Sequence, residues 1–290
     1  MARELTVLLE GGIFFEGPRW HDGRWWVSDM VDHVVLAIDQ RGRSERILTV
    51  EQQPSGLGWL PDGSLLVVSM KDHRLLRRWP DGHVTEHADL TERCGGWLND
   101  MVVDALGRAY VGNFGFDLFG DAERRPTVLV RVDPDGSTTV VADDLLFPNG
   151  MVMTPDGRTL IVGETFRSRY TAFRVNEDGS LTDRFTWADL ARTDIRDRFA
   201  PDGCALDAEG HVWSADARSG RCLRIGPGGS IVDAIDPPTG LRYYACMLGG
   251  ADGRSLLGCV APSVAKAVRD GRRDAVLVTT TVDNPHAGLP

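Results

Sequence analysis

Tight turns recur along this chain at a regular spacing, and that spacing constrains the fold more than any other feature. Each turn lies between two short apolar runs of β-type, which is the signature of a β-hairpin. The turn glycines are Gly23, Gly63, Gly107, Gly157, Gly210 and Gly253. They lie 40, 44, 50, 53 and 43 residues apart. Internal repeats of this length, each with room for about four strands, are typical of the blades of a β-propeller.

The sequence therefore predicts an all-β fold, a six-bladed β-propeller in which residues 1–290 form a single domain. A second turn within several units, as at Asp81-Gly82 and Asp135-Gly136, supplies the outer hairpin. The last unit has room for only about three strands. We expect the N-terminal strand, residues 6–9, to supply the fourth and close the last blade, which hides the sheet edges. Five or seven blades are the nearest alternatives.

The charge and composition of the chain exclude some classes of binding partner. The chain has 32 Lys and Arg against 42 Asp and Glu, a formal charge of −10, and no basic cluster. Neither nucleic acid nor a membrane is therefore expected as a partner. No apolar run is long enough to span a bilayer, and the N-terminus lacks the features of a signal peptide. The five cysteines have no CxxC spacing, which favours core residues in a reducing cytoplasm over disulfides or a zinc site. We expect a monomer or dimer.

Polar residues occupy matched positions in the repeats. Seven or eight residues before each turn glycine, at the loop entering the innermost strand, stand Glu16, Gly56, Asn99 with Asp100, Asn149, Asp202, and Ala245 with Cys246. Six or seven residues after each turn glycine, at the end of the second strand, stand Asp29, Ser69, Asn113, Glu164, Asp216 and Cys259. In a propeller both sets reach one mouth of the central channel. The sequence predicts a ring of carboxylates and carboxamides there.

Such a ring suits a cation. Carboxylates in a narrow mouth repel one another and lose hydration unless a positive charge lies among them. The oxygen donors of Glu16, Asn149 and Asp202, with Asn99 nearby, suit a hard divalent cation such as Ca²⁺, Mg²⁺ or Mn²⁺. The alternative is that these Asn and Asp residues only cap tight loops. The chain has no GxSxG, HExxH, Walker or GxGxxG motif that would point to another chemistry.

Four short segments carry a resemblance to a known family. They are EGPRW at 16–20, NDMVVD at 99–104, FPNGM at 147–151 and PDGCALDAEG at 201–210. In their order and spacing, over about residues 10–282, the chain resembles the senescence marker protein/regucalcin, gluconolactonase and lactonase-related family. The resemblance implies a six-bladed propeller that hydrolyses small lactones, while related six-bladed enzymes hydrolyse organophosphate esters. It also implies one catalytic divalent metal ion held by Glu16, Asn149 and Asp202, with Asn99 touching the substrate or the metal's water.

In the implied mechanism the cation polarises the lactone carbonyl, stabilises the oxyanion and lowers the pKa of a bound water. The predicted catalytic residues are Asp202 and Asn99. We prefer Asp202 over Glu16 as the base, because its second oxygen can stay free while the first ligates. Ligation alone would explain either carboxylate. We expect Ca²⁺ first, although Mn²⁺, Zn²⁺, Mg²⁺ and Fe²⁺ tolerate the same donors.

One position departs from the family. In sugar-lactone members an Arg two residues before the third-blade Asn contacts the substrate's hydroxyls, and here that position is Trp97. Further aromatic residues fall in the predicted mouth loops. The predicted substrate contacts are Asn99, Trp97, Phe15, Phe114, Phe147, Glu164 and Tyr244. Because binding of an apolar group to aromatic side chains removes water from apolar surface and is favourable, we expect a substrate less polar than a free sugar lactone. Alternatively, the rings pin the loops to the propeller.

Other functions stay open at this point. The same site could act on another ester or an organophosphate, since activated water does not choose its electrophile. A non-enzymatic propeller that binds calcium or a protein partner is a second alternative. A strictosidine-synthase-like enzyme, which does not need this metal set, is disfavoured by the joint presence of Glu16, Asn149 and Asp202. The insertion at 112–126 is expected to form a lid or a contact surface.

Overall fold

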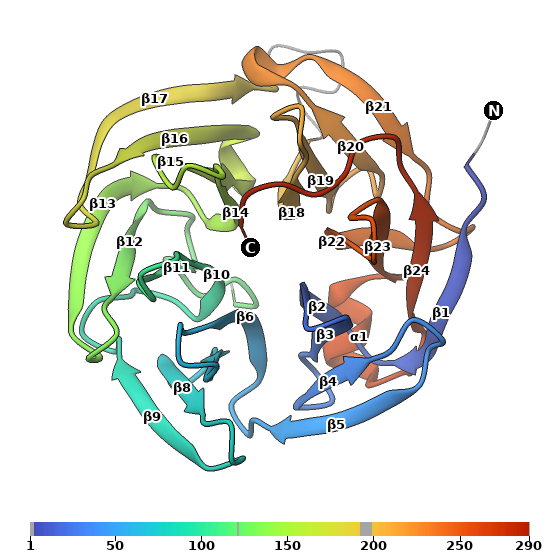
Figure 1. Ribbon diagram of the computed structural model, residues 1–290, viewed down its shortest axis with the longest axis horizontal. Helices are drawn as coiled ribbons and strands as arrows, with labels where there is room; N and C mark the ends of the chain where they lie inside the picture. Colours follow the sequence, from blue (N-terminus) through green and yellow to red (C-terminus); the bar gives the residue numbers. More distant parts are fainter. Residues whose placement is uncertain (1–2, 121, 192–198, 290) are drawn as a thin grey trace.

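Six four-stranded antiparallel sheets are arranged in a ring around a central axis in the computed structural model (Figure 1). The structure describes residues 3–120, 122–191 and 199–289. The remaining residues of the predicted 1–290 domain lie outside that description. Each of the first three sheets uses four consecutive strands. The first contains β2 (Phe15–His21), β3 (Arg24–Asp29), β4 (Val34–Ile38) and β5 (Ser44–Thr49), and the second contains β6 (Pro54–Trp59), β7 (Leu65–Ser69), β8 (Arg74–Arg78) and β9 (Val84–Asp89). The third contains β10 (Leu98–Val103), β11 (Ala109–Asn113), β12 (Thr127–Val132) and β13 (Thr138–Leu145).

The next two sheets follow the same order from the axis outward: β14 (Pro148–Met153), β15 (Thr159–Glu164), β16 (Arg169–Val175), β17 (Leu181–Asp189); β18 (Pro201–Leu206), β19 (Val212–Asp216), β20 (Cys222–Ile225), β21 (Ile231–Ile235). The sixth sheet joins the two ends of the chain: β22 (Arg242–Gly249), β23 (Ser255–Ala261), β24 (Ala275–Thr281), β1 (Thr6–Gly12). Because β1 pairs antiparallel with β24, the prediction of a six-bladed propeller closed by the N-terminal strand is confirmed.

The turn glycines and the burial pattern explain this arrangement. All six predicted turn glycines have positive φ, between 67° and 82°, a region that glycine adopts without steric cost. Every residue of the inner strands β10, β14 and β18 is buried, whereas the outer strands β5 and β13 consist of exposed and half-buried residues, apart from the last residue of β13. The core therefore lies between neighbouring sheets, and all five cysteines are free and buried in it.

Few helical elements interrupt the strands. In the described part of the chain the only α-helix is α1 (Val264–Asp270), between β23 and β24. No helix among the described residues is long and apolar enough to cross a membrane. The Ser263 hydroxyl caps α1 by accepting a hydrogen bond from the Lys266 amide. Two short 3₁₀ turns follow β15 and β20: η1 (Thr165–Arg167) and η2 (Pro227–Gly229).

Candidate active site

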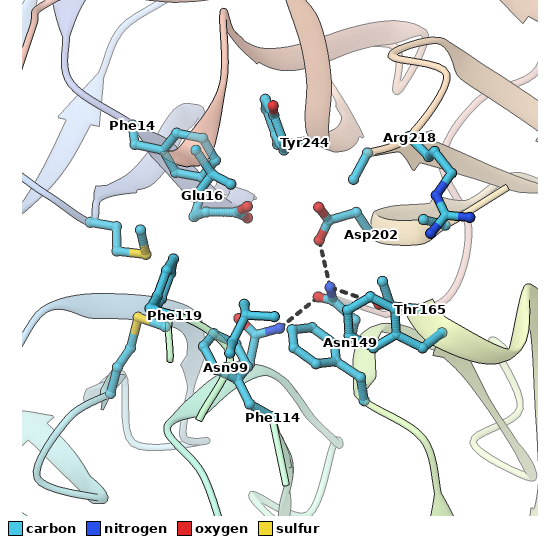
Figure 2. A pocket seen from close by; sticks show the side chains of 18 of the residues that line it. Phe14, Glu16, Asn99, Phe114, Phe119, Asn149, Thr165, Asp202, Arg218 and Tyr244 are labelled. Carbon is cyan, nitrogen blue, oxygen red and sulfur yellow. Dashed lines mark hydrogen bonds between the residues drawn. The ribbon is translucent and has the colours of Figure 1, made fainter. Parts of the chain in front are cut away.

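Each innermost strand has an irregularity in its pairing close to its first residues. The shifts lie between Glu16 and Arg19, Pro54 and Leu57, Leu98 and Met101, Pro148 and Met151, Pro201 and Cys204, and Tyr243 and Ala245. Asn99, Asn149, Asp202 and Tyr244 lie inside these bulges, and Glu16 borders one. Because a β-bulge re-aims side chains, the repeat turns these residues toward the axis from five blades (Figure 2).

Glycines beside these residues let neighbouring inner strands approach closely. A Cβ atom on Gly150 would lie 2.2 Å from the carbonyl oxygen of Asp202. One on Gly17, where φ is +54°, would lie 2.5 Å from the carbonyl oxygen of Ser55. Only glycine fits such contacts, so the Glu-Gly and Asn-Gly pairs of the motifs bring side chains from different blades together.

Hydrogen bonds link three of the predicted residues. The Nδ2 atom of Asn99 donates to Oδ1 of Asn149 at 2.8 Å. In turn Nδ2 of Asn149 donates to Oδ1 of Asp202 at 2.6 Å and to the Thr165 hydroxyl at 3.2 Å. The carboxylate of Glu16 faces Asp202 from the opposite side (Figure 2). The four residues predicted to form the ring therefore do come together.

The two carboxyl groups have perturbed acidity. Burial, and then the negative charge of Asp202, raise the pKa of Glu16 well above its usual range. Burial also raises the pKa of Asp202 to about 7, against the opposing effect of the bond from Asn149. The site thus brings two acidic groups together, and no Lys or Arg of the described residues is in salt-bridge contact with either.

Arg19 lies nearby, but its guanidinium group binds other protein groups. It is buried, and its guanidinium donates to Oδ1 of Asp100 at 2.6 Å. It also donates to the carbonyl oxygens of Leu57 and Met101 at 2.9 and 2.6 Å. A buried Arg needs such partners, and these bonds tie β2 to β6 and β10. Arg19 therefore supports the ring structurally.

The ring forms the floor of a cavity of about 350 Å³. Seven of the predicted residues line it: Glu16, Asn99, Asn149, Asp202, Phe114, Phe147 and Tyr244. Sequence reasoning did not assign substrate contacts to the others: Phe14, Met30, Met70, Leu118, Phe119, Thr165, Phe166, Ala200, Ala217, Arg218, Arg242 and Val264. Leu118 and Phe119 belong to the insertion at 112–126, of which residue 121 lies outside the described residues.

Three predicted substrate contacts, Phe15, Trp97 and Glu164, do not line the cavity. Side chains alternate along a strand, so Phe14 faces the cavity while Phe15 turns away. A Cβ on Gly12 would come within 2.1 Å of the Phe15 ring, so this ring packs on the backbone there. Trp97 packs behind Phe114 and Phe119, with ring centroids 6.1 and 5.1 Å apart.

Glu164 has a structural role instead. Its carboxylate is fully buried and pairs with Arg167 at 2.9 Å and Arg169 at 2.7 Å. It also accepts hydrogen bonds from the amide of Leu146 and the hydroxyl of Thr171, at 2.8 and 2.6 Å. The carboxylate is therefore fully occupied by protein partners.

Two other acids at the ends of second strands act in the same way. Asp29 accepts from the amides of Ile13 and Phe14 at 2.8 and 2.9 Å, and Asp216 accepts from the amide of Ala200 at 2.9 Å. The three acids of the second predicted set therefore anchor loops. In five of the six repeats the residue that follows the predicted position lines the cavity: Met30, Met70, Phe114, Thr165 and Ala217. The repeat spacing therefore identifies cavity-lining residues when each counted position is moved forward by one residue.

The donor set fits an oxygen-preferring divalent cation. Glu16 and Asp202 direct their carboxylates toward one space, and neither is paired with a Lys or Arg among the described residues; Asn149 lies beside Asp202, and its Oδ1 atom accepts a bond from Asn99. Ca²⁺ and Mg²⁺ take such ligands. The described residues contain no group of three His, Cys, Asp or Glu side chains able to hold a metal, so amide oxygens would have to contribute.

Comparison with known proteins gives relatives over most of the chain. A 6-deoxy-6-sulfogluconolactonase from Pseudomonas putida is 28% identical over 258 residues, covering 86% of this chain and 84% of that protein. A pentonolactonase from Haloferax volcanii is 28% identical over 245 residues, covering 83% and 79%. The solved structure of a calcium-binding regucalcin from Agrobacterium tumefaciens has the same fold, with a TM-score of 0.82, 22% identity, and coverage of 100% and 97%.

The family model described as SMP-30/Gluconolactonase/LRE-like region matches residues 14–259. This range spans most of the chain and includes Glu16, Asn99, Asn149 and Asp202, the four polar residues of the cavity floor. On this match, and on the six-bladed fold, the chain belongs to the SMP-30/gluconolactonase/LRE-like family.

Proposed function

We propose that this protein hydrolyses a small lactone, using a divalent cation bound by Glu16, Asn149 and Asp202. One observation carries the proposal: two carboxylates that form no ion pair with a Lys or Arg of the described residues face each other at the floor of a cavity large enough for a small molecule. The lactonase names of relatives that cover more than four fifths of the chain support the substrate class.

The bound cation would polarise the lactone carbonyl and make water more acidic. Asp202 suits the role of base because its buried carboxylate lines the cavity where the cation and its water would lie. Its Oδ1 atom accepts the hydrogen bond from Asn149, and a carboxylate that binds a cation through one oxygen can still accept a proton from water. The water oxygen then bonds to the carbonyl carbon, the bond from that carbon to the ring oxygen breaks, and the ring oxygen takes up a proton to give a hydroxy acid.

Asn99 suits the role of a substrate contact. One hydrogen of its amide group is used in the bond to Asn149, and the second is left to donate to a substrate oxygen. The Ser55 hydroxyl contacts its Oδ1 atom at 3.4 Å, which limits rotation of the amide. A donor held in this way can stabilise negative charge on the reacting oxygen.

The test combines metal removal with substitution. Chelation should abolish lactone opening, and restored Ca²⁺ or Mn²⁺ should recover it. Asp202→Ala and Asn149→Ala should each lower kcat/KM by about 10²-fold or more. Asp283→Ala, at a side chain that is 90% exposed, is the matched control and should leave activity unchanged.

Three outcomes would count against the proposal. Activity that survives chelation and both substitutions would exclude this mechanism. Metal binding by calorimetry without hydrolysis of any lactone would instead favour a binding propeller, and turnover of a phosphotriester alone would favour the organophosphate alternative.

A further inference from the structure

The cavity has a polar floor and a wall of stacked aromatic rings. The rings of Phe114 and Phe147 are nearly parallel, with centroids 4.6 Å apart and planes 12° apart. Phe166 meets Phe147 edge to face at 5.1 Å, and Phe119 meets Phe114 at 6.3 Å. These four residues, the aromatic wall, come from three different loops or turns of blades three and four. Such a wall offers a flat apolar surface next to the reacting groups.

The aromatic wall is held in place. Phe147 has φ of +59°, a conformation that costs a bulky residue energy and persists only where the surroundings enforce it. The guanidinium of Arg124 lies 4.0 Å from the centroid of the Phe166 ring. Behind the wall, Trp97 packs on Phe119, and the Arg125 side chain donates to the carbonyl of Gly115 at 2.9 Å. A preformed wall binds a ligand at a lower entropic cost.

The opposite side of the cavity is also apolar. Phe14 packs against Tyr244 with centroids 4.8 Å apart, and Met30, Met70 and Val264 complete this side. Apart from the floor, the polar groups of the lining residues are the hydroxyls of Thr165, which donates to the Pro201 carbonyl, and of Tyr244, and the guanidinium groups of Arg218 and Arg242. The hydroxyls of a polyhydroxylated ring that lay against the stacked phenyl rings would lose hydration there without replacement hydrogen bonds, which is unfavourable.

We propose that the preferred substrates are lactones that carry a hydrocarbon substituent, an alkyl chain or a fused aryl ring, which lies on the aromatic wall. The lactone carbonyl then faces Glu16 and Asp202. This proposal rests on the lactonase function above and adds its substrate class. The side chain of Phe119 supports it: the residue is 40% exposed beside the cavity, so it has apolar surface that a substituent would cover.

Three substrates test the class: γ-nonalactone, which has a pentyl chain, unsubstituted γ-butyrolactone, and glucono-1,5-lactone. We expect kcat/KM for γ-nonalactone to exceed that for either of the others by about 10²-fold, since each buried methylene adds several-fold. Equal or better turnover of the glucono-lactone would overturn the substrate class and leave the lactonase function standing. Failure to hydrolyse any lactone would overturn both.

Substitutions test the wall itself. Phe119→Ala and Phe166→Ala should each lower the ratio of kcat/KM for γ-nonalactone over γ-butyrolactone by about tenfold. Phe185→Ala, a ring on the outer strand β17 that is 49% exposed, is the matched control and should leave the ratio unchanged. Since general loss of structure would slow both substrates alike, an unchanged ratio in both wall variants would overturn the role of the wall.

Discussion

Asp202 and Glu16 determine how the site responds to protons. Both are acids in a space where burial disfavours the charged form, and the negative charge of Asp202 raises the pKa of Glu16 further. A bound cation would stabilise both negative charges, and protons compete with the cation for the same carboxylate oxygens. The acidity of these two residues and the occupancy of the site are therefore linked.

The apparent affinity for Ca²⁺ should fall as the pH drops through 7. Below its pKa of about 7, Asp202 holds a proton that the cation must displace, and Glu16, whose pKa is also raised, competes in the same way, so each lower pH unit should weaken binding about tenfold or more. Calorimetric titration of the metal-free protein between pH 5.5 and 8.5 measures this. Asp202→Asn should bind more weakly and depend less steeply on pH, and a pH-independent affinity of the unsubstituted protein would contradict the assignment.

At the scale of elements, one hydrogen bond repeats in five blades. In each of these blades, the amide of the residue just after the second strand donates to the carbonyl of the residue just before the inner strand. The pairs are Met30 to Phe14, Met70 to Gln53, Phe114 to Trp97, Thr165 to Phe147 and Ala217 to Ala200, at 2.9, 2.9, 2.9, 3.2 and 3.1 Å. Together with the acid anchors, these bonds fix the loops that form the cavity.

Removal of an anchor should cost stability. Asp29→Ala would leave the buried amides of Ile13 and Phe14 without acceptors, which should lower the free energy of unfolding by about 2–5 kcal/mol. Urea denaturation measures the loss. Glu45→Ala, which breaks the surface ion pair with Arg24, should change it by about 1 kcal/mol or less. Equal effects of the two substitutions would show that Asp29 is no anchor.

The sequence predicted the blade count and the polar floor because both depend on local signals. Turn glycines need positive φ, and the floor residues precede them at a fixed distance. The rest of the cavity lining was less predictable, because bulges and alternation decide which of two neighbours faces the cavity: Phe14 lines it and Phe15 does not. Contacts such as Trp97 behind Phe119 depend on loop conformation, for which the sequence has no periodic signal.

At the scale of the whole molecule, the two ends of the inner strands have different roles. The cavity lies where these strands begin, at Asn149 and Asp202. Where β14 and β18 end, at Met153 and Leu206, the C-terminal segment 285–289 crosses toward the axis (Figure 1). Backbone hydrogen bonds join it to three blades: Leu289 and Met153 bond in both directions, the amides of Ala287 and His286 donate to the carbonyls of Leu206 and Gly253, and the carbonyl of Pro285 accepts from the amide of Ala208.

This C-terminal segment should stabilise the ring without affecting the site. Truncation after residue 284 removes those five backbone bonds, at about 1 kcal/mol each, and should lower Tm by about 10 °C. Metal affinity of the folded protein should be unchanged, because the cavity lies at the other ends of the strands. Gly288→Ala offers a milder version, since its Cβ would lie 2.1 Å from the Met153 carbonyl oxygen. Calorimetric melting and Ca²⁺ titration of both variants would decide, and a loss of affinity with unchanged Tm would contradict the separation of the two ends.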